Sequence, residues 1–331
     1  YARARPADPP TRLAVTRAFV FYGGSDPTGE TERAVRVLAN VGDRKVPADA
    51  VVGANYPARE RLDVAVRNHG TVTLHGPRPH LADLIARAQL ALGAGGVTAW
   101  ERCTLGVPAV VTTIAANQNA PTQALAEAGA CVFAGASASM TDTRLRTCIA
   151  SLLHDPGARD RMALNAWLMT DGRGAERTAE VLLPTPSEAL RLREATKSDK
   201  YLYYIWANDP TVRNNAFQPE QISWSDHELW FDKKISSIQT LLLVLETPHD
   251  LPLGQFRVDV HDGIGEIGYS ISESFRGRGL GITLLNLAAD YLRRHTDTKE
   301  IIGYVLPGNF ASQRTFTRAG FLEHGLCADG N

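Results

Sequence analysis

Cysteine and methionine are scarce in this sequence, and neither sign of charge is in excess. The 331 residues include four cysteines and three methionines, and the formal net charge is −1. No two cysteines have the C-x-x-C spacing and none lies at metal-ligand spacing with a histidine, so no metal site is expected. We expect buried thiols in a reducing, cytoplasmic setting. Because there is no basic excess to attract a phosphate backbone, nucleic acid is excluded as an expected partner.

Long hydrophobic runs are absent too. The longest aliphatic run, residues 241–245, is far too short to cross a membrane, so no membrane partner is expected. Residues 1–10 are rich in Arg and Pro and lack the apolar stretch of a signal peptide. The chain begins with Tyr1 rather than Met, which is compatible with a fragment of a longer protein.

The composition and length fit two globular domains. Hydrophobic residues make up 44% of the chain and charged residues 21%, which is enough apolar material for two buried cores. Residues 184–188 carry prolines and small polar residues without apolar periodicity, and they are predicted to link the two domains. The predicted domains are therefore residues 1–183 and 189–331.

In the first domain, strand and helix patterns alternate. Such alternation predicts an α/β fold with a Rossmann-like parallel sheet wrapped by helices. Ligands bind such sheets at the loops beyond the carboxyl ends of the strands, and two glycine pairs, at residues 23–24 and 95–96, fall in loops of this kind. The predicted strands are residues 17–22, 48–53, 68–74, 90–93 and 108–112, and the predicted helices are residues 31–40, 79–88, 98–105, 142–154 and 159–170.

The second domain has a different order of elements. A series of strands is followed by helix, strand and helix, which predicts an α+β fold. The predicted strands are residues 190–194, 240–246, 252–260, 266–272 and 300–306, and the predicted helices are residues 198–208, 225–236, 283–295 and 312–319.

A glycine-rich turn joins a strand to the long helix of the second domain. The sequence EIGYSISESFRGRGLG begins at Glu266 and ends at Gly281. Glycines let the backbone turn tightly so that successive N–H groups converge, and a helix N-terminus favours an anion. We therefore predict an anion-binding loop formed by Arg276, Gly277, Arg278, Gly279, Leu280 and Gly281.

This turn resembles the acetyl-CoA motif of the GNAT superfamily. That motif has the pattern R/Q-x-x-G-x-G/A after a strand, and the family's second motif resembles the stretch from Asn309 and Ser312 through Phe316 to the Gly-Phe pair at residues 320–321. The resemblance implies an acyl-CoA-dependent N-acyltransferase. It implies that the N–H groups of residues 276–281 hold the CoA pyrophosphate, that main-chain groups around Tyr269 and Ile271 bind the pantetheine arm, and that Asn309 and Ser312 contact this arm or organise the second motif.

The chain departs from the family at one catalytic position. Phe316 stands where many members carry a tyrosine that protonates the leaving thiolate, so Tyr304 or water is expected to supply that proton. For the base that deprotonates the amine, Glu266 is the first candidate and His227 the second. Alternatively, Glu266 is a solvated carboxylate at a strand end and His227 is a histidine of a helix surface.

Residues 206–213 and 225–231 resemble the branch of the family that acetylates protein N-termini and nucleotide-linked amino sugars. The shared pattern is W-x-N-D-P-x-V-R followed by H-x-x-W-F. The resemblance implies an acceptor site lined by Asn208 and Arg213. The plainer alternative is a helix cap at Asn208 or Asp209 with aromatic core packing at residues 230–231.

The first domain resembles the nucleotide-binding half of the UDP-sugar hydrolases of pseudaminic acid biosynthesis, which have a two-lobed glycosyltransferase-B-like fold. The similar stretches are residues 21–26, 92–108 and 116–118. In this resemblance, glycine N–H groups and the Thr98 hydroxyl meet a diphosphate and Glu101 accepts the ribose hydroxyls. The implied nucleotide-binding residues are Gly23, Gly24, Ser25, Gly95, Gly96, Thr98, Glu101, Asn117 and Gln118.

Together the two resemblances predict a transferase that acetylates a UDP-linked amino sugar with acetyl-CoA. The hydrolase lobe that would supply a catalytic histidine is missing, so the chain alone is predicted not to hydrolyse the sugar–diphosphate bond. The first domain then binds nucleotide, docks a missing hydrolase lobe or only braces the transferase. Two alternatives are open: an acyl donor on the phosphopantetheine arm of a carrier protein, and a non-catalytic module that binds nucleotide and acyl-CoA.

Overall fold

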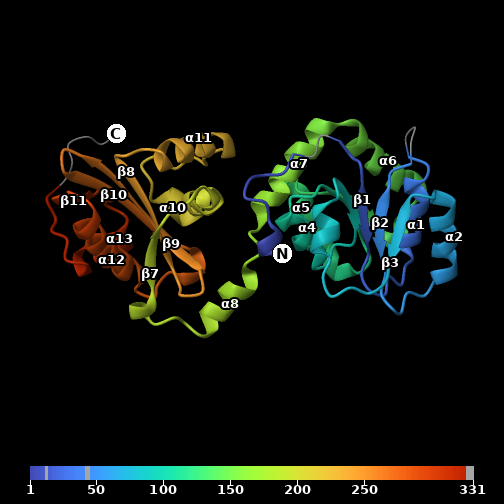
Figure 1. Ribbon diagram of the computed structural model, residues 1–331, viewed down its shortest axis with the longest axis horizontal. Coiled ribbons are helices and arrows are strands. Elements are labelled where there is room, and N and C mark those ends of the chain that lie inside the picture. Colours follow the sequence, from blue (N-terminus) through green and yellow to red (C-terminus); the bar gives the residue numbers. More distant parts are fainter. Residues whose placement is uncertain (12–13, 42–44, 326–331) are drawn as a thin grey trace. The chain divides into compact units, whose positions relative to one another are not determined.

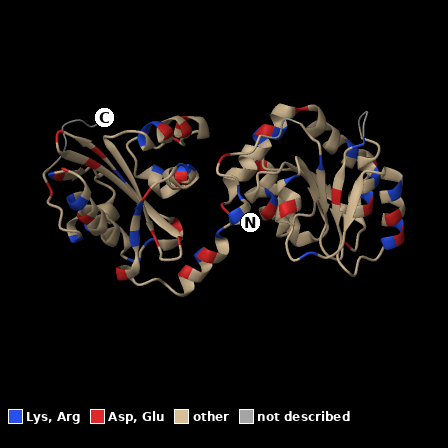
Figure 2. Ribbon diagram, in the orientation of Figure 1, with Lys and Arg blue, Asp and Glu red and all other residues tan. Residues whose placement is uncertain are grey.

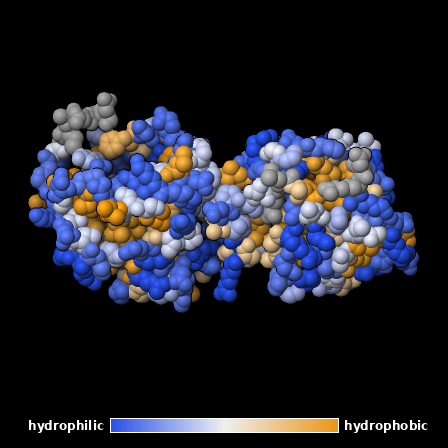
Figure 3. Space-filling view, turned by 45° about the horizontal axis from the view of Figure 1, so that its top comes forward, coloured by the Kyte–Doolittle hydropathy of each residue, from blue (hydrophilic) through white to orange (hydrophobic). Residues whose placement is uncertain are grey.

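The computed structural model describes residues 1–11, 14–41 and 45–325, and these residues form two compact units (Figure 1). The first unit spans Tyr1–Arg173 and the second begins at Gly174. Among the described residues, no helix is long and apolar enough to cross a membrane. Charges of both signs are dispersed over the helices of both units (Figure 2), and hydrophilic residues surround separate apolar patches on the face that Figure 3 shows.

The first unit contains a six-stranded parallel sheet in the order β3-β2-β1-β4-β5-β6. The strand order reverses between β1 and β4, and in such sheets the crevice beyond the carboxyl ends of these strands is the usual ligand site. The strands are β1 (Ala18–Phe21), β2 (Ala48–Val51), β3 (Val72–His75), β4 (Leu90–Gly93), β5 (Ala109–Thr113) and β6 (Val132–Ala136).

Helices cover both faces of this sheet and give it two hydrophobic cores. Alternate strand residues point to opposite faces, so Ala18 and Val20 pack with one set of helices and Phe19 with the other. One face carries α1 (Glu30–Leu38), α2 (Arg59–His69) and α6 (Asp142–His154); the other carries α3 (Ala82–Ala86), α4 (Thr98–Thr104) and α5 (Asn119–Glu127), and α7 (Pro156–Met169) contributes to both cores. The predicted Rossmann-like parallel sheet is confirmed.

The predicted third strand, residues 68–74, is wrong at its start. Asn68 and His69 end α2, His69 is buried, and the strand begins at Val72. The β-branched residues of α2 disfavour a helix locally, so α2 depends on packing of its apolar face. Sequence patterns also did not predict α2, α5 or β6.

Of the cysteines, Cys103 and Cys131 are buried as expected, Cys148 is partly buried, and Cys327 lies outside the described residues.

The second unit contains a five-stranded sheet in the order β11-β10-β9-β8-β7. Its neighbouring strands are antiparallel except for β10 and β11, which are parallel. The long helix α12 (Leu280–His295) connects that parallel pair. The strands are β7 (Arg191–Glu194), β8 (Thr240–Glu246), β9 (Pro252–His261), β10 (Ile264–Ile271) and β11 (Glu300–Gly303).

The two faces of this sheet have separate cores. Helix α12 and the end of α13 (Phe310–Arg318) pack on one face, and α9 (Lys200–Ala207) and α11 (Trp224–Ile235) pack on the other. The short helix α10 (Pro210–Asn214) follows α9. Helix α8 (Gly174–Leu182), which the sequence patterns did not predict, precedes the proposed linker and belongs to the second unit.

A buried ion network joins β7 to β8 and to the start of α9. The Arg193 guanidinium donates to both carboxylate oxygens of Asp199, at 2.7 and 2.8 Å, and to Glu246 at 2.7 Å. Arg191 donates to the other oxygen of Glu246 at 2.9 Å. Both carboxylates are almost inaccessible, at 2% exposure for Glu246 and 3% for Asp199. These hydrogen bonds raise the pKa of Arg193 above its ordinary range.

Candidate active site

The glycine-rich turn lies between β10 and α12. Gly277 has φ +75° and Gly279, the N-cap of α12, has φ +79°, which is a conformation that L-residues with a Cβ seldom adopt. A Cβ at either glycine would meet no atom within 4 Å, so the side of the turn where these Cβ atoms would stand is open. No described residue accepts a hydrogen bond from the main-chain N–H groups of residues 277–281. The turn therefore offers converging donors to an anion at the start of a 16-residue helix.

The two arginines of the turn have different environments. The Arg276 guanidinium donates to the carbonyl of Ile271 at 3.0 Å and forms an ion pair with Asp209 at 2.8 Å. Arg278 is exposed, its guanidinium lies 6.0 Å from the centre of the Phe275 ring, and it forms no ion pair within the described residues. The charge of Arg276 is thus compensated, whereas that of Arg278 is available to a ligand.

Strands β10 and β11 separate next to this turn. Their pairing ends at Ile267 and Gly303, whereas β10 continues beside β9 to Ile271. The N–H of Ser272 donates to Leu253 of β9 at 2.8 Å. Because the main-chain groups of successive strand residues point to opposite edges, those of Tyr269 and Ile271 face the opening left by β11. The carbonyl of Ile271 accepts a hydrogen bond from Arg276. The N–H groups of Tyr269 and Ile271 and the carbonyl of Tyr269 therefore remain available to a ligand.

The predicted strand at residues 300–306 ends early, at Gly303. The Phe316 ring packs directly against the last residue of the strand, since a Cβ built at Gly303 would lie only 2.4 Å from its Cζ atom. The ring packs edge-on against Tyr269 and Phe321, with centroid distances of 5.6 and 4.8 Å. The side chain of Phe316 therefore packs α13 against the end of β11.

The second motif is held together by Asn309 and Ser312. The Asn309 side chain is the N-cap of α13 and accepts the N–H of Ser312 at 3.1 Å. The Ser312 hydroxyl lies 3.2 Å from the Tyr269 hydroxyl, so this motif is connected to the open strand. Asn309 thus fixes the start of the helix of the second motif, and its contact with the pantetheine arm stays a prediction.

Two of the three predicted catalytic residues border the opening. Glu266 is exposed on β10, opposite Asp259 of β9 and Ile302 of β11, and its carboxylate has no partner among the described residues. Tyr304 follows the last residue of β11 and is 47% exposed. Glu266 and Tyr304 are therefore both accessible where the two strands diverge.

The structure does not support His227 as a base. His227 is 1% exposed, and its Nε2–H donates to the Lys200 carbonyl at 2.8 Å. Its ring packs among the aromatic rings of Tyr204, Trp224, Trp230 and Phe231. Burial lowers the pKa of His227. The prediction was wrong because helical spacing alone does not show which side of α11 faces the core.

Asn208 and Arg213, predicted to line an acceptor site, hold the loop between α10 and α11 by hydrogen bonds to its main chain. The Asn208 side chain donates to the Ile222 carbonyl at 3.1 Å and accepts the Ile222 N–H at 2.8 Å. The Arg213 guanidinium donates to the carbonyls of Gln218 and Glu220, at 3.1 and 3.3 Å, and burial lowers its pKa. The Arg213 Nε is buried without a hydrogen-bond partner among the described residues.

A polar strip on the sheet face that carries α9 and α11 was not predicted. The Gln255 side chain donates to the Ser270 hydroxyl at 3.3 Å, while its own Oε1 is buried without a hydrogen-bond partner. Arg257 lies beside Gly268, with its guanidinium 5.9 Å from the Trp230 ring centre. Glu266 shares this face because it is two residues from Gly268. The alternation of polar residues at 255, 257 and 259 within the apolar strand β9 could have revealed the strip.

In the first unit, the two glycine loops lie at the strand-order reversal. Gly23, Gly24 and Ser25 follow β1, Gly95 and Gly96 follow β4, and these two strands pair directly. A Cβ built at Gly95 would lie 2.1 Å from the Thr122 hydroxyl and 3.2 Å from Gln118.

The other predicted nucleotide-binding residues surround the second loop. Gln118 also accepts the Ile114 N–H at 3.1 Å, and Asn117 is exposed. Thr98 and Glu101 are partly buried in the first turn of α4. Tyr1 packs close to Glu101; burial and this carboxylate raise the pKa of Tyr1 to about 12, and its hydroxyl accepts the Leu81 N–H at 3.1 Å.

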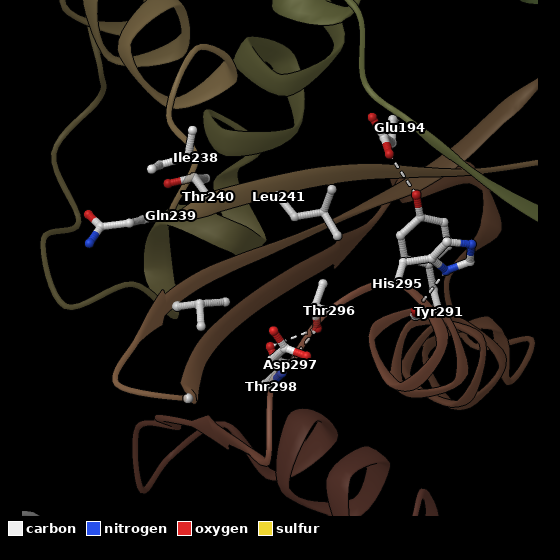
Figure 4. Close-up of a pocket in the computed structure, with 12 residues that line it drawn as sticks. Glu194, Ile238, Gln239, Thr240, Leu241, Tyr291, His295, Thr296, Asp297 and Thr298 are labelled. Carbon is white, nitrogen blue, oxygen red and sulfur yellow. Dashed lines mark hydrogen bonds between the residues drawn. The ribbon is translucent and has the colours of Figure 1, made fainter.

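A cavity of about 360 Å³ lies elsewhere in the second unit, at the C-terminal end of α12 (Figure 4). Tyr291 and His295 stack there at 4.2 Å, and the Tyr291 hydroxyl donates to Glu194 at 2.7 Å. Since α12 has 16 residues, this cavity is roughly 24 Å from the glycine-rich turn. The cavity is therefore separate from the candidate active site.

Comparison with known proteins identifies the second unit. Residues 189–322 match the family model of the acetyltransferase (GNAT) domain. The chain is 21% identical over 317 residues to an uncharacterized protein of Methanocaldococcus jannaschii, a match that covers 92% of this chain and 61% of the relative. The chain thus spans about three fifths of the length of the curated relative it matches.

Solved structures similar to the chain include a spermidine N-acetyltransferase from Vibrio cholerae in complex with CoA and spermine. It is 22% identical with a TM-score of 0.39, and the match covers 42% of this chain and 83% of that one. An aminoglycoside acetyltransferase in complex with coenzyme A is 19% identical with a TM-score of 0.37, covering 41% and 86% of the two chains. A domain from Methanocaldococcus jannaschii is 20% identical with a TM-score of 0.37, covering 43% and 93%.

The second half of the chain is an acetyltransferase domain of the GNAT family, as the matched model and the turn between β10 and α12 show. Two of the similar solved structures, the spermidine N-acetyltransferase and the aminoglycoside acetyltransferase, are complexes with CoA.

Proposed function

We propose that this chain transfers the acetyl group of acetyl-CoA to the amine of a nucleotide-linked amino sugar, with a UDP-amino sugar as the first candidate. The observation that carries the proposal is the combination of two sites in one chain. One is the glycine-rich turn beside the separated strands β10 and β11. The other is the pair of glycine loops at the strand-order reversal of a Rossmann-like sheet.

The donor is held by main-chain groups. The free N–H groups of residues 277–281 bind the pyrophosphate, and the exposed Arg278 adds a positive charge. The N–H groups of Tyr269 and Ile271 face the gap beside β11, where one bonds a pantetheine amide and the other polarises the thioester carbonyl.

The acceptor amine approaches over the polar strip of β9 and β10. Glu266 takes a proton from the ammonium form of this amine, directly or through one water, and the free amine nitrogen then attacks the thioester carbon. The tetrahedral intermediate collapses as the C–S bond breaks. The departing CoA thiolate takes a proton from Tyr304, because Phe316 carries none to give.

The first unit carries a nucleotide site of its own. The N–H groups of the two glycine loops and the Thr98 hydroxyl bind the diphosphate, and Glu101 binds the ribose hydroxyls. Helix α4 has only seven residues, so these individual donors contribute more than the helix dipole. Without a catalytic histidine in these loops, the unit binds the nucleotide and does not cleave it.

The proposal predicts a preference among amines. CoA release, measured with a thiol reagent, should be at least tenfold faster in kcat/KM with UDP-4-amino sugars than with N-terminal peptides or polyamines, since only the first class offers a nucleotide to bind. Acetyl-CoA should also be a better donor than an acetyl group on a carrier protein. Faster acetylation of a peptide or polyamine would overturn the proposed acceptor, and preference for the carrier protein would overturn the proposed donor.

Replacement of Gly95 by alanine tests the nucleotide site of the first unit. The added methyl group would overlap the Thr122 hydroxyl, so the loop must move. We expect UDP affinity, measured by calorimetry, to fall about tenfold or more, with kcat for a nucleotide-free amine unchanged. Gly76→Ala is the control, because a Cβ there meets nothing within 4 Å. Unchanged UDP affinity in Gly95→Ala, or no UDP binding by the unmodified protein, would contradict the nucleotide assignment.

A further inference from the structure

We propose that Asp209 is a positioning residue that sets the conformation of the glycine-rich turn through Arg276 and connects this turn to the loop following α10. The inference rests on the proposed donor site at residues 277–281. It concerns a residue that lies far from the turn in sequence and outside both acetyl-CoA motifs.

The ion pair fixes the first residue of the turn. Arg276 follows the short 3-10 helix Glu273–Phe275 and directly precedes Gly277, whose positive φ starts the donor-bearing backbone. Its side chain is held at two points, by the Ile271 carbonyl at 3.0 Å and by Asp209 at 2.8 Å. The two side chains are only 29% and 10% exposed, so water screens the pair incompletely. Loss of the pair would release the turn at the residue where its special backbone begins.

Asp209 also caps α10, the helix that precedes the loop leading to α11. The same carboxylate oxygen that meets Arg276 accepts the Val212 N–H at 3.1 Å and so caps α10. The neighbouring Asn208 holds Ile222 by two hydrogen bonds, which closes the loop between α10 and α11. A single carboxylate therefore contacts both the glycine-rich turn and the helix that precedes the loop between α10 and α11.

The two arginines of the turn should then respond differently to substitution. Arg276 is neutralised by Asp209 and acts through geometry. Arg278 carries the uncompensated charge and acts by attracting the pyrophosphate. Removing Asp209 also leaves Arg276 with a free charge, which alone would favour an anion. We expect the loss of backbone order to dominate, because the N–H donors must converge to bind.

Asp209→Asn is the decisive variant because asparagine caps helices as well as aspartate does but cannot form the ion pair. We expect about a tenfold rise in KM for acetyl-CoA and a smaller rise in KM for the acceptor, with kcat changed less than threefold. Arg276→Lys, which keeps the charge but cannot bridge Ile271 and Asp209, should behave in the same way. If Asp209 served only as a cap, Asp209→Asn would match the unmodified enzyme and only Asp209→Ala would be impaired.

Arg278→Gln separates failure of this inference from failure of the donor site. If the turn binds CoA, Arg278→Gln raises KM for acetyl-CoA by about tenfold, an effect that weakens with added salt, and leaves KM for the acceptor unchanged. A normal Asp209→Asn enzyme beside an impaired Arg278→Gln enzyme would overturn the coupling alone. If both variants bind acetyl-CoA normally, the donor site itself is misplaced.

Discussion

Replacement of Glu266 by glutamine should lower kcat by about a hundredfold to ten-thousandfold, the usual contribution of a general base. Glutamine has the size of glutamate but cannot take a proton at neutral pH. Glu266 is exposed and its carboxylate has no partner among the described residues, so its replacement should leave the fold and acetyl-CoA binding intact. The measurement is the steady-state rate of CoA release, with acetyl-CoA affinity determined separately by calorimetry.

The pH profile distinguishes a base from a merely acidic surface. In Glu266→Gln the defect should shrink as pH rises, because a growing fraction of the acceptor amine is already unprotonated and needs no base. Glu300→Gln is the matched control, since Glu300 is an exposed carboxylate at the start of the neighbouring strand β11. If Glu266→Gln keeps the normal kcat, or loses it equally at every pH, Glu266 is not the base.

The sequence allowed prediction of the elements whose cause is local. The glycines at 277 and 279 adopt positive φ in a turn that no bulkier residue suits, and their spacing predicted this turn. Strands β4 and β8 were predicted with their observed bounds, because each is a short apolar run bordered by residues that do not continue it. The parallel sheet followed from the alternation of strands and helices.

The parts that could not be predicted depend on distant partners. Helix α2 contains β-branched valines and many charges, and it is helical because Leu62 and Ala65 pack on the core. The hydrogen bonds of Asn208 and Arg213 could not be predicted, because their partners, Ile222, Gln218 and Glu220, are placed by the loop and not by the motif. A motif gives the residue type, whereas the fold decides which of its polar atoms remain free for a ligand.

The same limit applies to the aromatic segment of α11. His227 and Phe231 are four residues apart, so they share one face of the helix, and both are buried. Sequence predicted the core position of Phe231 but treated His227 as a candidate base. The polar strip of Gln255 and Arg257 differs, because the alternation of polar and apolar residues along β9 already indicates that these two side chains share one face of the sheet.

Replacement of Arg193 by methionine should destabilise the second unit by about 3–5 kcal/mol, the usual cost of removing one partner of a buried ion pair. Asp199 would lose both of its hydrogen bonds to the guanidinium, and Glu246 would retain only Arg191. Denaturant unfolding followed by tryptophan fluorescence measures the effect, since Trp206 and Trp230 border the aromatic core of this unit. Because Asp199 directly precedes α9, acetyltransferase activity should disappear at the same denaturant concentration as the structure.

Arg191→Met is the control for that prediction. Arg191 shares Glu246 with Arg193, but it is half exposed and its other partner, Asp250, lies in solvent, so its loss should cost about 1 kcal/mol or less. Adding Asp199→Asn and Glu246→Gln to Arg193→Met should restore part of the lost stability, because in the single variant the buried carboxylate of Asp199 has lost its ion pair and that of Glu246 keeps only Arg191. If the triple variant were no more stable than the single one, packing of the Arg193 stem would be the main contribution and the network would not be the electrostatic anchor of α9.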